Sequence, residues 1–147
     1  MNEITVVNGR RLIYQRHALD INWDQAMTLK NWLLLVIIEG KDKHILSEIS
    51  KKSVDYGACY VCCVGEQGQL LHDMIDGEII LREIVEHQLP QFDVTMTTWH
   101  SDLNEALWFA FFVANNPPET IETILCLDAS ALGVEIPLDE IIKSWDQ

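Results

Sequence analysis

The sequence WLLLVIIE at residues 32–39 decides the fold. Seven apolar residues in succession are typical of a short strand that is covered on both faces. The run is also far shorter than the ~20 apolar residues that a bilayer-spanning helix requires. We therefore expect residues 32–38 to form a central strand of a parallel sheet, with helices packed above and below it.

Three further apolar runs alternate with helical patterns after this strand. Within the helical stretches apolar residues recur three or four positions apart, and Gly57 follows the first stretch as a typical C′ residue. Asp76-Gly77 can divide the second stretch into two helices. The alternation predicts a three-layer α/β/α fold with a mostly parallel sheet of about four core strands. The expected strands are residues 32–38, 58–64, 94–99 and 121–127, and the expected helices are residues 43–56, 66–87 and 103–114.

Shorter elements are expected outside this core. Asn8-Gly9 is a typical centre of a type I′ turn, so residues 4–14 are predicted to form a β-hairpin that extends an edge of the sheet or covers one end of it. Residues 20–28 are expected to be a connection with a short helical turn, and Pro137 is a start signal for a helix over residues 138–145. We expect a single α/β domain over residues 1–147, with the hairpin in residues 1–16, the α/β core in 32–128 and a C-terminal tail with a short helix in 129–147.

The expected helix 103–114 has an unusual composition. Asp102, three residues before Glu105, resembles an N-cap with its capping-box partner. The sequence ALWFAFFVA that ends this helix has no polar face wide enough to meet water. We therefore expect its aromatic side chains Trp108, Phe109 and Phe112 to be largely buried.

The charge of the chain excludes two classes of partner. Its 147 residues include 23 acidic and 10 basic side chains, a formal net charge of −13. A protein with this balance offers no general surface to nucleic-acid phosphates and is not attracted to an anionic membrane, so we expect neither partner. The first residues, MNEITVVNGRR, lack the basic segment and long apolar run of a secretory signal, which favours a cytoplasmic location.

The cysteines resemble a metal or redox motif only superficially. Cys59-x-x-Cys62-Cys63 lies in an expected strand, where Cys62 and Cys63 point to opposite faces. A redox motif would begin a helix, and a zinc site would need a second pair of ligands. We interpret these side chains, with Cys126, as small buried apolar groups, and we expect no metal site and no cofactor.

The turn after the expected strand 94–99 is the best candidate for a catalytic or ligand-binding site. Ligands of open parallel sheets bind outside the carboxyl ends of the strands. There the sequence TTWHSD places two hydroxyls, a tryptophan, a histidine and a helix N-cap close together, and a histidine in such a turn is often a general base. The alternative is that the hydroxyls bond to nearby backbone while the tryptophan packs. The catalytic candidates are Thr97, Thr98, His100 and Asp102, and a triad could also draw on Ser101, Cys62 or His72.

A second candidate is an acidic segment, residues 66–86, which contains one basic residue, Arg82. An acidic helix face is often only a solubilising surface. It can also attract and orient a basic partner, because complementary charge accelerates association. The candidate binding residues are Asp73, Asp76, Glu78, Glu83 and Glu86, together with Trp99.

Three sequences in residues 58–112 carry a resemblance to a family: ACYVC from Ala58, LHDMIDGE from Leu71, and TTWH from Thr97 followed by LNEALWF from Leu103. They resemble an uncharacterised bacterial domain family of unknown function. The TTWH…EALWF sequence is the most specific part. The resemblance implies no activity, but it marks positions for inspection: His72, Asp73, Asp76, Glu78, Thr97, Trp99 and His100.

Two functional hypotheses of different classes follow. In the first, the chain is a small acidic protein-binding domain, such as an immunity protein that neutralises a toxin by filling its basic cleft in place of phosphates. In the second, it is a small enzyme or ligand-binding domain with its site around Thr97–Asp102. A deep pocket containing His100 and a carboxylate would favour the enzyme, whereas a flat acidic surface with plugged strand ends would favour the binding domain.

Overall fold

The computed structural model describes residues 2–18, 31–86, 95–117 and 120–146. The expected connection at residues 20–28, the last residue of the expected helix 66–87 and the first of the expected strand 94–99 lie outside this description. In order along the chain, the elements are β1 (Asn2–Val7), β2 (Arg10–Arg16), β3 (Trp32–Ile38), α2 (Lys43–Asp55), β4 (Tyr60–Val64), α3 (Gly68–Leu81), the π-helix η1 (Arg82–Glu86), β5 (Met96–His100), α4 (Leu103–Phe112), β6 (Thr123–Ala129), α5 (Leu138–Lys143) and the 3-10 helix η2 (Ser144–Asp146).

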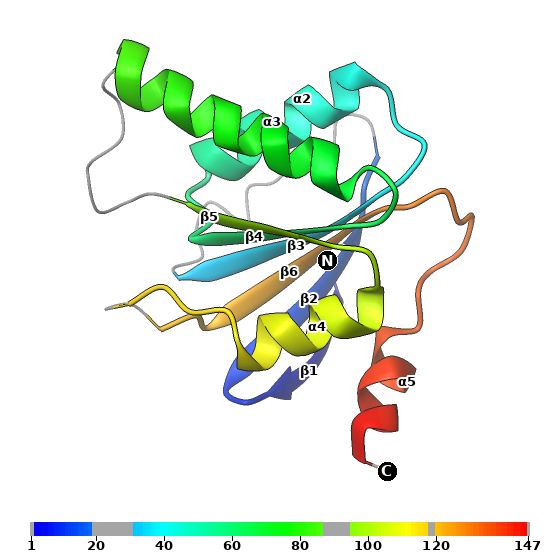
Figure 1. The fold of residues 1–147 in the computed structure, drawn as a ribbon. Coiled ribbons are helices and arrows are strands. Elements are labelled where there is room, and N and C mark those ends of the chain that lie inside the picture. The colour runs from blue at the N-terminus through cyan, green and yellow to red at the C-terminus, as the bar shows by residue number, and fades with distance from the viewer. Residues whose placement is uncertain (1, 19–30, 87–94, 118–119, 147) are drawn as a thin grey trace.

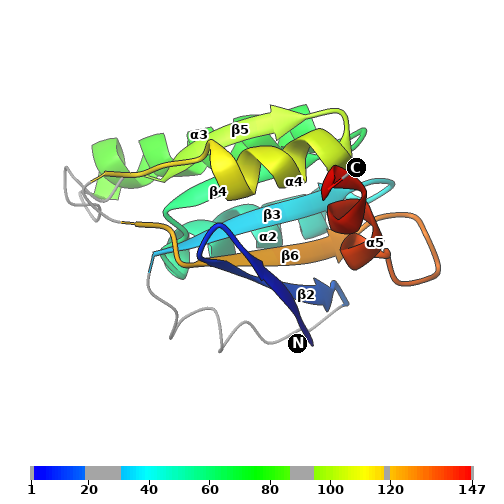
Figure 2. The same cartoon turned by 90° about the horizontal axis from the view of Figure 1, so that it is seen from below.

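The fold is α/β, with one sheet of six strands in the order β1-β2-β6-β3-β4-β5. The four strands expected for the core are adjacent in the order β6-β3-β4-β5, and every pair among them is parallel. Figures 1 and 2 show α2 and α3 on one face of this sheet and α4 and α5 on the other. The predicted three-layer arrangement is confirmed.

The strand β3 supplies the centre of both hydrophobic cores. All seven of its side chains are buried. Leu34, Val36 and Ile38 pack toward α2 and α3, and Leu33, Leu35 and Ile37 pack toward α4. The uninterrupted apolar run thus reflects a strand whose alternating side chains all meet protein.

The N-terminal hairpin forms as predicted and extends the edge of the sheet. Asn8 and Gly9 adopt φ angles of 53° and 74°, as a type I′ turn requires. Strand β2 pairs in parallel with β6. The turn also reaches α4, because the Asn8 side-chain amide donates to the Phe111 carbonyl (2.8 Å) and the Arg10 guanidinium donates to the Ala110 carbonyl. These bonds satisfy carbonyls that the end of a helix leaves without intrahelical donors.

The helix α3 is not divided at Asp76-Gly77. It runs without a break to Leu81 and continues into η1. A helical glycine costs only about 1 kcal/mol relative to alanine. The burial of Leu71, Ile75 and Ile79 against the sheet outweighs that cost, so the local break signal is overridden.

The prediction that Trp108, Phe109 and Phe112 of α4 are largely buried is wrong. Trp108 is 49% exposed and Phe112 is 44% exposed, while Phe109 is only partly buried. The face that packs on the sheet is instead made of Ala106, Leu107, Ala110 and Phe111. The small alanines let the helix axis approach the sheet, so the larger aromatic side chains on the other side remain outside. Trp145 of η2 packs against Phe111 of the sheet-facing side and against Phe112 of the outer side.

This geometry predicts losses of stability of very different size for two aromatic residues of the same helix. Phe111→Ala should reduce the free energy of unfolding by about 3–5 kcal/mol, because Phe111 is fully buried. Trp108→Ala should cost less than about 1.5 kcal/mol, because half of the side chain already meets water. Urea unfolding monitored by far-UV circular dichroism measures both. Equal losses in the two variants would contradict the observed orientation of α4.

Candidate functional site

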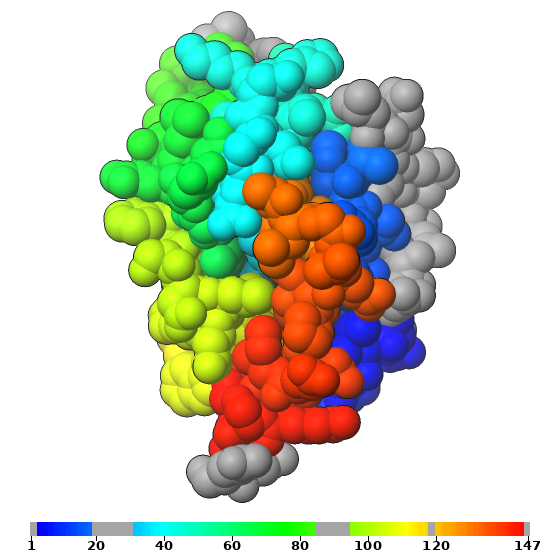
Figure 3. Space-filling model, turned by 90° about the vertical axis from the view of Figure 1, so that its right-hand side faces the viewer, coloured from blue at the N-terminus to red at the C-terminus, as the bar shows by residue number. Residues whose placement is uncertain are grey.

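Loops bonded to one another close the carboxyl ends of the central strands. After β3 and β4, the Gly40 amide donates to the Glu66 carboxylate (2.9 Å), the Lys41 amide donates to the Gln67 side chain (2.8 Å), and Gln67 Nε2 donates back to the Lys41 carbonyl (2.7 Å). Gly65 lies so close to β3 that a Cβ there would be 2.8 Å from the Ile38 carbonyl oxygen. Figure 3 looks onto this end of the molecule and shows the segment after β6, in orange, packed against the loops that follow β3.

The switch in strand order, where open sheets usually bind ligands, lies between β3 and β6. Here the Glu39 amide donates to the Ala129 carbonyl (3.1 Å), and the Ala131 amide donates to the Glu39 carboxylate (3.4 Å). The buried Asp128 accepts from the Tyr14 hydroxyl and from the Ser130 amide. Burial and this carboxylate raise the pKa of Tyr14 well above its usual value. Most polar groups of this end are therefore engaged with one another, but the buried Ser130 hydroxyl has no hydrogen-bond partner among the described residues.

The strand β5 brings two of the four candidate catalytic residues, Thr98 and His100, together on its α4 face. Thr98 Oγ1 lies 2.9 Å from His100 Nε2, and His100 Nδ1 lies 2.6 Å from Glu105 Oε2. When His100 carries its proton on Nδ1, it donates to Glu105 and accepts from the Thr98 hydroxyl. This is the order of nucleophile, base and orienting carboxylate that covalent catalysis uses.

The side chain of His100 is buried. It is 7% exposed, and the ring of Phe109 lies with its centroid 5.0 Å away. On the neighbouring strand β4, burial raises the pKa of the Cys62 thiol to about 12. A hydrogen bond with the Thr98 hydroxyl partly opposes this increase. Cys62 is therefore not a thiolate nucleophile near neutral pH.

The opposite face of β5 carries a second polar network. Thr97 Oγ1 donates to Asp76 Oδ1 of α3 (2.6 Å). His72, one turn earlier in the helix, lies 3.5 Å from the other oxygen of Asp76 and 3.1 Å from Asp73 Oδ1. The predicted positions His72, Asp73, Asp76 and Thr97 thus meet, but on the other side of the strand from His100.

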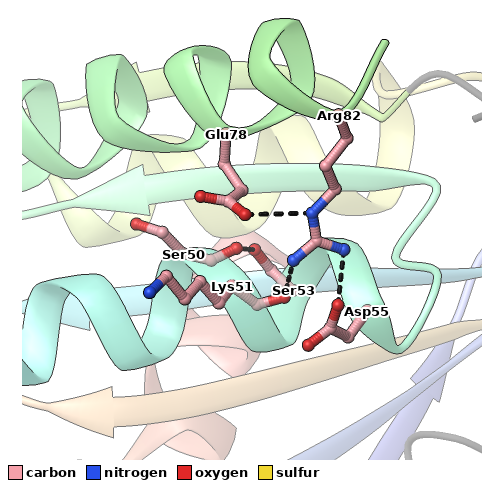
Figure 4. A network of polar contacts seen from close by, with 6 residues as sticks. All are labelled: Ser50, Lys51, Ser53, Asp55, Glu78 and Arg82. Atoms are coloured by element: carbon pink, nitrogen blue, oxygen red, sulfur yellow. Dashed lines mark hydrogen bonds and ion pairs between the residues drawn. The ribbon is translucent and has the colours of Figure 1, made fainter. Parts of the chain in front are cut away.

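Arg82 turns away from β5 and toward α2. Its Nε donates to Glu78 (2.9 Å), one Nη bonds to Asp55, and the other bonds to the Lys51 carbonyl (3.5 Å), as Figure 4 shows. The two carboxylates raise the pKa of this guanidinium despite its partial burial. Glu78 is therefore paired with Arg82, which in turn bonds to α2, and it is not part of a free acidic face.

The remaining candidates have separate places. Asp102 caps α4 by accepting from the Glu105 amide (3.1 Å), which is a structural role. Trp99 projects from β5 and is 49% exposed, and Glu83 is exposed at the start of η1. The side chain of Glu86 lies outside the described residues. The sequence pattern identified Glu105 only as a capping-box residue, although its carboxylate bonds to His100.

The described residues contain no group of three or more His, Cys, Asp or Glu side chains arranged to hold a metal ion. In the same part of the chain, no helix has the length and apolar character needed to cross a bilayer.

Comparison with known proteins gives one match. A family model described as "Domain of unknown function (DUF7684)" matches residues 12–144. No curated protein and no solved structure matches the chain.

The Arg82 network makes a testable contribution to stability. Arg82→Met should reduce the free energy of unfolding by roughly 1–3 kcal/mol, because Glu78 is left largely covered and without its cation. Adding Glu78→Met should recover part of the loss, since both members of the pair are then apolar. A double-mutant cycle from urea unfolding measures the coupling. Simple additivity of the two single changes would show that the pair contributes nothing.

Proposed function

The chain belongs to the family described as "Domain of unknown function (DUF7684)", a description that states no activity, and we propose from its own structure that it is a protein-binding domain for a basic partner. The proposal rests on one observation, the exposure and the ion-pair partners of the carboxylates around β5. Asp73, Asp76 and Glu105 have side chains that are 65%, 44% and 57% exposed, and their ion-pair partners among the described residues are histidines. Glu83 is also exposed, and no ion pair to another described residue involves it.

These carboxylates are not neutralised by Arg82, because its side chain points toward α2. Arg82 is the one basic residue of the segment 66–86, and it is bound to Asp55 and Glu78 on the side of α2. Carboxylates without a fixed cation create a negative potential that attracts a basic protein and orients it. The net charge of −13 acts in the same direction.

Apolar side chains beside these carboxylates supply contact area. Trp99 is half exposed on β5, and Ile80 and Ile84 are 54% and 66% exposed on the neighbouring helix. Interfaces typically combine apolar anchors with a polar rim, and tryptophan is enriched among the residues that dominate binding energy. A toxin that cuts nucleic acid is a partner of suitable chemistry, because a cleft that holds phosphates is basic. Neutralising such a toxin would make this chain an immunity protein.

The charge hypothesis can be tested with deca-lysine as a basic probe. The double reversal Asp73→Lys with Glu83→Lys should weaken binding about tenfold at low salt, and the effect should shrink near 0.15 M, where the Debye length is about 8 Å. Asp76 and Glu78 are left unchanged because they bond to Thr97 and Arg82. Calorimetric titration measures the dissociation constant.

The matched control is Asp139→Lys with Glu140→Lys on α5, which makes the same change in net charge at exposed positions. Its affinity for deca-lysine should fall much less than that of the α3 variant. An equal loss in the two variants would show that the probe responds only to net charge, and the docking surface on α3 would then be refuted.

A second candidate function is acyl transfer at Thr98, which the row Thr98–His100–Glu105 specifically favours. His100 Nε2 can take the hydroxyl proton as Thr98 Oγ1 attacks an ester carbonyl, and it can return this proton to the departing alkoxide as the ester C–O bond breaks. Glu105 holds the imidazole in the required tautomer. The exposed carboxylate of Glu105 leaves this end of the row open to water.

Hydrolysis of p-nitrophenyl acetate tests this candidate. Thr98→Val and His100→Gln should each lower turnover by about 100-fold or more, as loss of a general base or nucleophile does. Thr97→Val, the same change on the other face of β5, should leave turnover within about twofold. A wild-type rate no greater than that of free imidazole at equal concentration would exclude an acyl-transfer site.

A further inference from the structure

The strand β5 forms one edge of the sheet, and the direction of its backbone groups follows from its pairing with β4. The Met96 amide donates to the Cys59 carbonyl (3.2 Å), and the His100 carbonyl accepts from the Gly65 amide (3.3 Å). Successive residues of a strand direct their N–H and C=O groups to opposite sides. The backbone N–H and C=O groups of Met96, Thr98 and His100 therefore point toward β4 and bond within the sheet. Those of Thr97 and Trp99 point away from β4, where no other described residue bonds to them.

This edge lacks several of the usual features that prevent pairing, although the strand is short, with 5 residues. Its sequence, MTTWH, contains no charged residue and no proline, and Met96 and Trp99 are about half exposed. The opposite edge differs, because β1 has an irregular register between Glu3 and Thr5, and Glu3 forms an ion pair with Arg11. Bulges and charges are the means by which natural sheets protect their edges. Only the β1 edge of this sheet is protected in that way.

Carboxylates flank the β5 edge on both faces of the sheet. Asp76 lies on the α3 face, bonded to Thr97, and Glu105 lies on the α4 face, bonded to His100. A strand added to this edge would project its side chains alternately to those two faces. Lysine or arginine side chains at successive positions would then reach Asp76 and Glu105.

We propose that the partner binds by adding a basic, extended segment as a seventh strand at the outer edge of β5. The inference rests on the proposed function, since it specifies how the basic partner would be held. The backbone groups of Thr97 and Trp99 supply hydrogen bonds, and the flanking carboxylates select positive charge. A second copy of this chain fits the edge poorly, because its own β5 carries no cation to meet these carboxylates.

The probe for this mode is the peptide VKKVKKV, which combines strand propensity with positive charge and directs adjacent lysines to opposite faces of an added strand. The variant Thr97→Pro removes one outward N–H and leaves the donors of the β4–β5 ladder in place. Its matched control is Thr97→Val, which also removes the hydroxyl that bonds to Asp76 but keeps the N–H. Affinity should fall about tenfold in the proline variant and less than about threefold in the valine variant.

Amide hydrogen exchange in the wild-type chain is a second measurement that does not depend on the folding of a variant. Saturating VKKVKKV should slow exchange at the Thr97 and Trp99 amides by about tenfold or more, because these groups gain partners. The Ile80 amide, which lies within α3, serves as the reference for general stabilisation. Protection at Thr97 and Trp99 that exceeds protection at Ile80 supports the added strand.

The outcomes separate this inference from the proposed function. Binding that is lost with Asp73→Lys and Glu83→Lys, but is unchanged in Thr97→Pro and gives no selective protection at Thr97 and Trp99, would overturn the added strand and leave the acidic docking surface intact. Peptide binding that none of these changes affects would overturn both. Sedimentation that shows a wild-type dimer, converted to a monomer by Thr97→Pro, would assign the edge to a second copy and would also overturn the inference.

Discussion

The need to cover both faces of β3 governs the rest of this structure. Seven consecutive buried side chains require a packed layer on each side, and neither layer can be omitted without exposing at least three large apolar groups. The chain meets the requirement with α2 and α3 on one side and α4 on the other. The parallel pairing of β3 with β4 and β6 follows, since helical crossovers are what place helices on the faces of a sheet.

How far the sequence predicts the structure depends on the range of the interactions. The strands, α2 with Gly57 after it, and the turn at Asn8-Gly9 follow from local patterns, and all were predicted. The orientation of α4 was not, because its sequence is apolar on every side and so does not indicate which side meets the sheet. Contacts with the hairpin turn and Trp145, about 100 and 30 residues away in sequence, accompany that orientation.

In the candidate sites, too, local features follow from the sequence and contacts between elements do not. The sequence TTWH predicted one cluster of hydroxyls and histidine, but alternation across β5 separates the two hydroxyls, so that Thr97 joins Asp76 and Thr98 joins His100. The pairing of His100 with Glu105 spans a strand-to-helix turn, and no fixed spacing predicts it. The acidic segment was likewise visible in the composition. The Glu78–Arg82 pair has the i,i+4 spacing of neighbours on one helix, whereas the bonds from Arg82 to Asp55 and to the Lys51 carbonyl depend on how α3 packs on α2.

The large negative charge and the exposed strand edge have opposite consequences for association, and together they favour selectivity. An uncharged edge with half-exposed apolar residues tends to pair with any available strand, including that of another copy. Two copies that each carry a charge of −13 repel one another, and the carboxylates nearest the edge would approach their counterparts. At 4 Å one such contact costs about 1 kcal/mol in water and about 4 kcal/mol at a partly desolvated surface. The same carboxylates would favour a basic strand by energies of that order, so charge discriminates between partners that the backbone alone would accept equally.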